Sequence, residues 1–166
     1  EMEKHVLSIL VENQAGVLSR VAGLFTRRGY NIDSLTVGET ADSSISRMTI
    51  VVRGDEYILE QIRKQLNKLI DVIEIVQLVP EESVNREIAL IKVVADSNTR
   101  SEIFETVNIF RGKIIDIASE SVIIEVTGDE RKITALIDIL RPYGIKEMVR
   151  TGLTALARGD KGLSNK

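Results

Sequence analysis

The residues best suited to chemistry lie in the polar stretch Asn13-Gln14-Ala15-Gly16. An apolar run precedes this stretch and an amphipathic run follows it, which predicts a loop leading into a helix. Backbone N–H groups in the first turn of a helix lack partners and attract anions. The side chain of Asn13 can donate or accept hydrogen bonds, and Gly16 allows close approach to the backbone. The loop therefore predicts a site for a small carboxylate or phosphate, although a tight turn with an N-cap and no ligand would use the same residue types.

Two further residues could serve the same site. Asn31 follows Gly29 at the expected start of the next strand, and we expect it near the same end of the helices as the loop; a turn residue at a helix exit is the alternative. Arg20 lies in the first turn of the predicted helix and could approach an anion, or it could be a solvated surface arginine. The nearby carboxylates are predicted to be solvated or ion-paired surface groups: Asp33, Glu39 and Asp42.

Composition excludes several classes of chemistry. The 166 residues include no Cys and one His, which excludes disulfides and thiolate catalysis and leaves little for imidazole catalysis or a metal site. We predict that His5 occupies a plain surface position. The net charge of −3 gives no basic footprint for nucleic acid. No apolar run approaches the ~20 residues that span a bilayer, and no secretory signal is recognisable, so we expect a cytoplasmic protein.

The elements that must position these residues follow one order twice. In the first half, extended patterns at residues 5–11, 31–40, 45–53 and 72–79 alternate with helical patterns beginning at Val17 and after the Gly54-Asp55 stop and cap. In the second half, a capping box of Thr99 with Glu102 opens a helix, and Gly128-Asp129 repeats the earlier stop and cap. The stretch 145–156 is predicted to be one long final strand.

This repetition predicts an α+β fold of two tandem β-α-β-β-α-β (ferredoxin-like) sandwiches. We place the first domain at residues 1–79, a linker at 80–85, the second domain at 86–158 and a flexible tail at 159–166. In each domain two helices cover one face of a four-stranded sheet, so we expect edge pairing or face packing between copies to cover the other face. The second copy of the loop, at residues 96–99, has no glycine, so only the first copy retains the ligand-like pattern.

Several blocks of sequence resemble one family. The run LVENQAGVLSRV at residues 10–21 and the run RGYNIDSLTV at residues 28–37 closely resemble the regulatory small subunit of acetohydroxyacid synthase, also called acetolactate synthase. The resemblance continues through SRMTI, IFRG, RTG and RGD at residues 46–50, 109–112, 150–152 and 158–160. It covers nearly the whole chain, and the first block is specific, whereas the order of elements alone would indicate only a large superfold.

The resemblance implies an N-terminal ACT domain that senses a branched-chain amino acid, chiefly valine, at an interface between two such domains. It implies a subunit without catalysis of its own, which activates the thiamine-diphosphate-dependent catalytic subunit and confers feedback inhibition. Thiamine diphosphate, magnesium and FAD are expected on that catalytic partner, and no cofactor or metal is expected on this chain. The effector-binding residues implied are Asn13, Gln14, Ala15, Gly16, Val17, Leu18, Asn31 and Ile32.

Physical chemistry agrees with this assignment of roles. N–H groups at the helix N-terminus suit a carboxylate, Asn side chains or backbone carbonyls suit an ammonium group, and Val17, Leu18 or Ile32 suit an aliphatic side chain. One methylene changes binding by only about 1–3 kcal/mol, so the motif does not separate valine from leucine or isoleucine. We predict that Asn31 comes from a neighbouring subunit.

Two alternatives come from other functional classes. An acylphosphatase-like small hydrolase would grip a phosphate with the loop between Asn13 and Arg20, but Arg20 falls one helical turn after Gly16 rather than inside the loop. RNA-recognition domains share the order of elements, and the tripeptide at residues 28–30 matches a fragment of their aromatic motif. That tripeptide lies at a helix exit and lacks the aromatic residues that should follow it.

Overall fold

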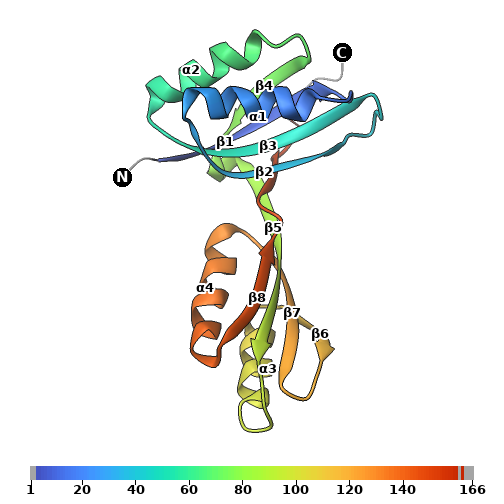
Figure 1. The fold of residues 1–166 in the computed structure, drawn as a ribbon, viewed down its shortest axis with the longest axis vertical. Helices are drawn as coiled ribbons and strands as arrows, with labels where there is room; N and C mark the ends of the chain where they lie inside the picture. Colours follow the sequence, from blue (N-terminus) through green and yellow to red (C-terminus); the bar gives the residue numbers. More distant parts are fainter. Residues whose placement is uncertain (1–2, 161, 163–166) are drawn as a thin grey trace. The chain divides into compact units, whose positions relative to one another are not determined.

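The computed structural model describes residues 3–160 and 162, which divide into two compact units. Unit 1 contains residues up to Asn85 together with the segment from Leu153 onward, and unit 2 contains Arg86–Gly152. Figure 1 shows the order of the elements along the chain. The tandem α+β architecture predicted from the repeated pattern is confirmed.

Unit 1 contains a four-stranded antiparallel sheet with strand order β2-β3-β1-β4. Its helices, α1 and α2, lie on one face of this sheet and enclose a core with its apolar side chains (Figure 1). Asp55 caps α2 by accepting a hydrogen bond from the Ile58 N–H at 2.9 Å, as the stop-and-cap pattern predicts. The elements are β1 (Lys4–Glu12), α1 (Val17–Arg28), β2 (Asn31–Glu39), β3 (Ile45–Arg53), α2 (Glu56–Asn67), β4 (Val72–Leu78) and the 3₁₀ turn η1 (Pro80–Glu82).

Unit 2 repeats this plan with strand order β6-β7-β5-β8 and helices α3 and α4 over a second apolar core. Asp129 caps α4 through the Lys132 N–H at 2.9 Å. The capping box predicted at α3 does not form. The Thr99 side chain does not cap the helix, and Glu102 instead accepts from the Tyr143 hydroxyl at 2.9 Å. The elements are β5 (Ser83–Val94), α3 (Arg100–Ile109), β6 (Lys113–Ile117), β7 (Ser121–Gly128), α4 (Glu130–Leu140), the 3₁₀ turn η2 (Arg141–Tyr143) and β8 (Ile145–Arg150).

The final extended stretch is two strands rather than one. After β8 the chain turns at Gly152, whose φ of 81° is in the left-handed region, and then forms β9 (Thr154–Ala157), which pairs with β5. β9 belongs to unit 1, whereas the sequence pattern places residues up to 158 in the second domain. The predicted linker at 80–85 is also partly regular, because η1 and the start of β5 lie within it.

This returning segment covers the sheet face of unit 1 that the helices leave open. β9 contacts β1 and β4, and the Leu153 carbonyl accepts a hydrogen bond from the Thr36 hydroxyl at 3.2 Å. Leu7 and Ile9 face the helices, so the alternation of a strand directs Ser8 and Leu10 to the other face, where they are nevertheless 0% and 3% exposed. In unit 1 the chain's own C-terminal segment therefore provides cover that we expected from a second copy.

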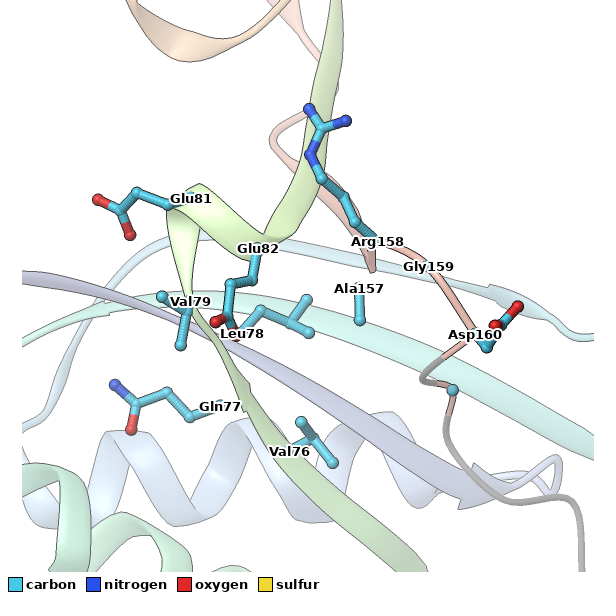
Figure 2. Close-up of a pocket in the computed structure, with 11 residues that line it drawn as sticks. Val76, Gln77, Leu78, Val79, Glu81, Glu82, Ala157, Arg158, Gly159 and Asp160 are labelled. Carbon is cyan, nitrogen blue, oxygen red and sulfur yellow. The ribbon is translucent and has the colours of Figure 1, made fainter.

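A cavity of about 610 Å³ lies where this segment passes β4 and η1. Val76 and Leu78 on β4 and Ala157 on β9 give it an apolar lining, and three carboxylates lie around it: Glu81, Glu82 and Asp160 (Figure 2). None of its lining residues belongs to the predicted effector set. Gly159 and Asp160 of the predicted tail are placed here, whereas residues 161 and 163–166 of that tail lie outside the described part of the chain.

Candidate functional site

The loop between β1 and α1 has the conformation that an anion site would need. Gly16 is the N-cap residue of α1, with a φ of 87° that glycine adopts without strain. Among the described residues no side chain caps this end of α1, and its first turn contains no acidic residue. Within the described part of the chain, no carboxylate therefore accepts a hydrogen bond from the N-terminal N–H groups of α1.

Hydrogen bonds on both sides hold the loop in place. On one side, the Asn13 amide donates to the Ser43 carbonyl at 2.9 Å and to Glu39 at 3.2 Å, which ties the loop to the β2–β3 hairpin. On the other side, the Glu12 N–H donates to the Asp71 carbonyl at 2.9 Å, just before β4. The loop is thus fixed between the two edges of the sheet before any ligand binds.

The predicted aliphatic contacts separate into two kinds. Val17 is 3% exposed and its side chain packs in the core of unit 1, so only its backbone faces the loop. Leu18 is 44% exposed beside it and can meet an apolar ligand group. Gln14 and Ala15 are both exposed in the loop, and the Gln14 carbonyl accepts from the Val17 N–H at 3.4 Å.

Asn31 and Ile32 lie at the other end of the sheet from the loop. Asn31 pairs with Arg53 at the end of β3, whereas the last residue before the loop, Glu12, pairs with Ile45 at its start. β3 is 9 residues long, which corresponds to roughly 26 Å at about 3.3 Å per residue. The expectation that Asn31 lies near the loop is therefore wrong within one chain, because α1 carries the chain back along the sheet and β2 starts at the end opposite the loop.

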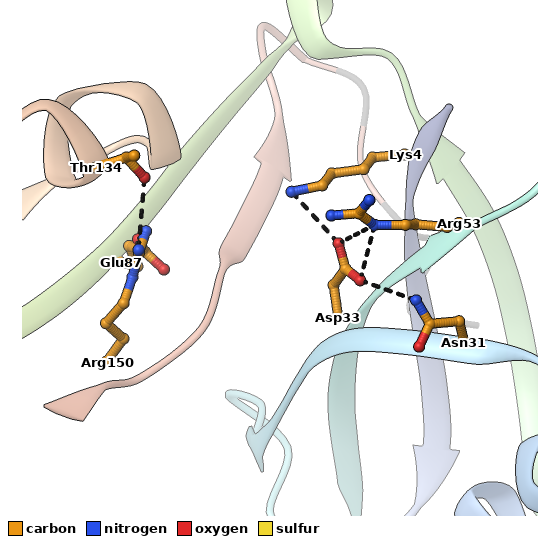
Figure 3. Close-up of polar contacts among 7 residues, drawn as sticks. All are labelled: Lys4, Asn31, Asp33, Arg53, Glu87, Thr134 and Arg150. Atoms are coloured by element: carbon orange, nitrogen blue, oxygen red, sulfur yellow. Dashed lines mark hydrogen bonds and ion pairs between the residues drawn. The ribbon is translucent and has the colours of Figure 1, made fainter. Parts of the chain in front are cut away.

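A charged cluster surrounds Asn31. Its amide donates to Asp33 at 3.4 Å, and Asp33 also accepts from Arg53 at 2.9 Å and pairs with Lys4 at 3.3 Å (Figure 3). Partial burial opposes ionisation of Asp33, but the bonds from Arg53 and Lys4 outweigh it and lower the pKa of Asp33 below its usual value. Asp33 also interrupts the register of β2 with β3, so the strand bulges beside Asn31.

Sequence reasoning assigned His5 to the wrong environment and did not find the ion-pair partner of Arg20. His5 is not on the surface: it is 8% exposed, with Nε2 bonded to the Gly54 carbonyl at 3.0 Å and Nδ1 to the Gln77 amide at 3.2 Å. Arg20 is not simply solvated, because its Nε donates to Asp71 at 2.7 Å. That hydrogen bond raises the pKa of Arg20 above its usual value. Only long-range packing brings residue 71 to residue 20, so no local pattern could have revealed the pair.

The second copy of the loop differs in the residue that meets the helix. The Asp96 carboxylate accepts from the Asn98 N–H at 2.8 Å and from the Thr99 N–H at 3.0 Å at the start of α3. These backbone bonds, that from Thr99 being the largest cause, lower the pKa of Asp96. In unit 2, a carboxylate of the chain itself thus occupies the helix N-terminus.

The described residues show no grouping for other common chemistries. Within residues 3–160 and 162, no three His, Asp or Glu side chains are close enough together to hold a metal ion. Over the same residues, no helix has the length and apolar character needed to cross a bilayer.

Comparison with known proteins identifies the family. Residues 7–74 match the AHAS small subunit-like ACT domain, and residues 86–159 match the family described as small subunit of acetolactate synthase. The chain is 57% identical to a probable acetolactate synthase small subunit of Archaeoglobus fulgidus, over 95% of this chain and 99% of that protein. It is 54% identical to the acetolactate synthase small subunit of Mycolicibacterium smegmatis, over 96% of this chain and 94% of that protein.

A solved structure agrees with these sequence matches. The crystal structure of the acetolactate synthase small subunit from Thermotoga maritima superposes with a TM-score of 0.89 at 46% identity, covering 96% of this chain and 100% of that one. The loop that is open at Gly16 lies within the matched ACT domain, and the self-capped loop at Asp96 lies within the second matched region. This chain therefore belongs to the family of acetolactate synthase small subunits, with an ACT domain as its first unit.

Proposed function

We propose that this chain is a non-catalytic subunit that activates the catalytic large subunit of acetohydroxyacid synthase and makes it sensitive to feedback inhibition by a branched-chain amino acid. Valine is the first candidate, with leucine and isoleucine as the others. The observation that carries the proposal is the α1 N-terminus at Gly16, which no described side chain caps, in an ACT domain of this family. Thiamine diphosphate, magnesium and FAD belong to the catalytic partner in this proposal, and both subunits work in the cytoplasm.

The loop offers complementary groups for each part of an amino acid. The carboxylate meets N–H groups of the first turn of α1, where the helix dipole favours negative charge. The exposed Leu18 supplies apolar contact for the aliphatic side chain, and in a shared site Ile32 would come from a second copy of the chain. Asparagine side chains or backbone carbonyls accept from the ammonium group.

The sheet register supports a site shared between two copies of the chain. β2 is an edge strand, so its outer edge can pair with β2 of a second copy. In a two-fold antiparallel pairing centred on Leu35, Asn31 of one copy would lie opposite Glu39 of the other, because Leu35 is midway between them. Glu39 accepts from the Asn13 amide at 3.2 Å, so Asn31 of one copy would arrive beside the loop of the other. Asn31 and the loop are thus far apart within one chain but would lie close together across the interface between two copies.

Such a shared site gives a route to regulation. A ligand that bridges two ACT domains stabilises the dimer conformation in which the loop and the neighbouring β2 fit it best. The ligand can change the activity of the catalytic subunit only by its difference in affinity for the active and inhibited states. Activation and inhibition are therefore separable properties of the same chain.

The direct test is reconstitution with the catalytic subunit. Acetolactate formation is measured for the catalytic subunit alone, with this chain, and with this chain plus increasing valine, leucine or isoleucine. We expect the rate to rise when this chain is added and to fall again with one of the three amino acids. An unchanged rate in the presence of a co-purifying chain would refute the proposed activation.

A complementation experiment tests whether the site is shared. Asn13→Ala and Asn31→Ala variants are each expected to lose amino-acid inhibition as homodimers, because every shared site lacks one of the two groups. When the two variants are unfolded together and refolded, half of the dimers should be mixed, and each mixed dimer contains one site with both asparagines. Recovery of inhibition only after mixing supports a shared site, whereas a site within one chain would show no recovery.

We do not propose the acylphosphatase-like alternative. The family assignment covers both units, and Arg20 is bonded to a carboxylate in the structure.

A further inference from the structure

Asp71 anchors both ends of the candidate loop. It lies in the turn between α2 and β4 and is 5% exposed. Its backbone carbonyl accepts from the Glu12 N–H at 2.9 Å, and its carboxylate accepts from Arg20 Nε at 2.7 Å. Glu12 directly precedes the loop and Arg20 lies one turn into α1, so one buried residue fixes the chain on either side of Gly16.

Arg20 directs unused hydrogen-bond donors toward Gly16. A Cβ placed on Gly16 would lie 2.9 Å from Arg20 Nη1, so the guanidinium rests against this glycine. Within residues 3–160 and 162, Asp71 is the only partner of the Arg20 side chain, and the bond uses Nε. A guanidinium carries five N–H donors, so those of its two Nη atoms are available to an anion. Its side chain is 48% exposed, whereas that of Asp71 is 7% exposed.

Helix stability does not account for this arrangement. A positive charge near the N-terminus of a helix opposes the helix dipole, and an acidic residue would stabilise the first turn of α1 better. The buried carboxylate of Asp71 offsets the unfavourable charge and turns the guanidinium back toward the loop. At this end of α1, the guanidinium of Arg20 is therefore exposed to solvent or a ligand, whereas the carboxylate of Asp71 is buried.

We propose that Arg20, oriented by Asp71, recognises the negative charge of the ligand's carboxylate at the Gly16 loop. This inference rests on the proposed amino-acid site and names the side chain that distinguishes an amino acid from its uncharged derivatives. Asp71 acts as a positioning residue: it holds Nε, fixes the plane of the guanidinium and leaves the Nη donors for the ligand.

The test compares L-valine with L-valinamide, which lacks the carboxylate charge. Both are titrated calorimetrically into the full chain, and a charge-assisted hydrogen bond should favour valine by about 10- to 100-fold in Kd. Arg20→Gln should remove most of this preference. It should raise the Kd for valine and change the Kd for valinamide by less than about 3-fold. Arg20→Lys keeps the charge without the planar fork, so it should retain part of the preference.

Two further variants separate recognition from loss of structure. Arg27→Gln removes the same charge from the last turn of the same helix and should leave both affinities unchanged. Asp71→Asn keeps the shape of the side chain but removes the charge that orients Arg20. It should lower the affinity for valine more than the affinity for valinamide. Thermal unfolding of each variant confirms that it is folded.

The outcomes distinguish the two proposals. If the wild-type chain, alone and with its catalytic subunit, binds none of the three branched-chain amino acids, the proposed function fails and this inference fails with it. The other case is that the wild-type chain binds valine, but Arg20→Gln lowers the affinities for valine and valinamide by the same factor or lowers neither. The proposed function then survives and the role of Arg20 is refuted.

Discussion

The two helix N-termini that follow the first strand of each unit satisfy the same physical requirement in different ways. At α3, Asp96 bonds the N–H groups of Asn98 and Thr99, so the chain provides its own anion. At α1, Gly16 provides no side chain, and the charged group that rests against it is the Arg20 cation. A repeat of one fold thus contains one self-satisfied loop and one loop that suits an external carboxylate.

This difference indicates that the loop before α1 suits ligand binding, whereas the loop before α3 contributes to stability. In unit 2, the Asp96 carboxylate holds the loop before α3 by accepting from two of its N–H groups. The α1 loop is fixed by contacts that its neighbours make, through Asn13 and through Asp71, so its helix end stays accessible. We therefore expect changes at the α1 loop to alter ligand binding most, and changes at the α3 loop to alter stability.

The largest effect is expected from placing a carboxylate directly at the open N-terminus of α1. Gly16→Asp places a carboxylate at the α1 N-terminus, forces a strained φ and meets the Arg20 guanidinium. We expect valine affinity to fall by about 100-fold or more, at a stability cost of about 1 kcal/mol for the left-handed backbone. Titration calorimetry and urea unfolding measure the two effects.

A matched control for this variant is Gly159→Asp. Gly159 has a φ of 72°, and a Cβ added there would meet nothing within 4 Å, so the substitution introduces similar backbone strain without a contact at the loop. Equal loss of valine affinity in both variants would show that strain, rather than the occupied helix end, causes the effect.

The next effect is expected from removing the cap of unit 2. Asp96→Ala should lower the melting temperature by a few degrees, because α3 loses the acceptor for two N–H groups, and it should leave valine inhibition unchanged. Scanning calorimetry of the chain and inhibition of the reconstituted enzyme provide the measurements. A shift in valine response would break the comparison, since it would make the second loop part of the effector site.

At low pH, the wild-type chain and a variant without the Asp96 carboxylate should have the same stability. The folded pKa of Asp96 lies below its usual value of 3.8, so its carboxylate stabilises the fold at pH values above that range. The contribution is lost as pH falls through the lower folded pKa. Urea unfolding of wild type and Asp96→Asn from pH 7 down to about pH 3 should therefore show two curves that converge toward the acid end.

The smallest effect is expected at the exposed contact of the first loop. Glu39→Gln keeps an acceptor for the Asn13 amide, which also remains bonded to the Ser43 carbonyl. We expect valine affinity to change by less than about 3-fold, since exposed interactions of this kind contribute little. A much larger change in the same titration would mean that Glu39 itself contacts the ligand.

Sequence patterns anticipated what depends on near neighbours. The helix of residues 17–28 ends at the predicted Gly29, and Asp55 and Asp129 both cap as their spacing indicates. At α3 the pattern predicts the N-cap position of Thr99 correctly, but the Thr99 side chain makes no capping bond, and Asp96 three residues earlier accepts from the Thr99 N–H instead.

The features that sequence patterns did not reveal depend on contacts between distant residues. The bond from Arg20 to Asp71, the two bonds of the buried His5 and the return of β9 to unit 1 each bring together residues far apart in sequence. Periodicity reports which face of an element is apolar but not which distant group meets it. The open helix end at Gly16 was local and therefore predictable, whereas the cation beside it acquired its orientation from the fold.

The return of β9 to unit 1 has a consequence for synthesis on the ribosome. Unit 1 begins at the N-terminal end of this chain, yet the segment that covers Ser8 and Leu10 is translated only after all of unit 2. A nascent chain that ends before Leu153 would carry an ACT domain whose open sheet face lacks this cover, with Leu10 exposed to proteases and chaperones. The first unit is thus complete only after the second unit has been translated, which links its maturation to synthesis of that unit.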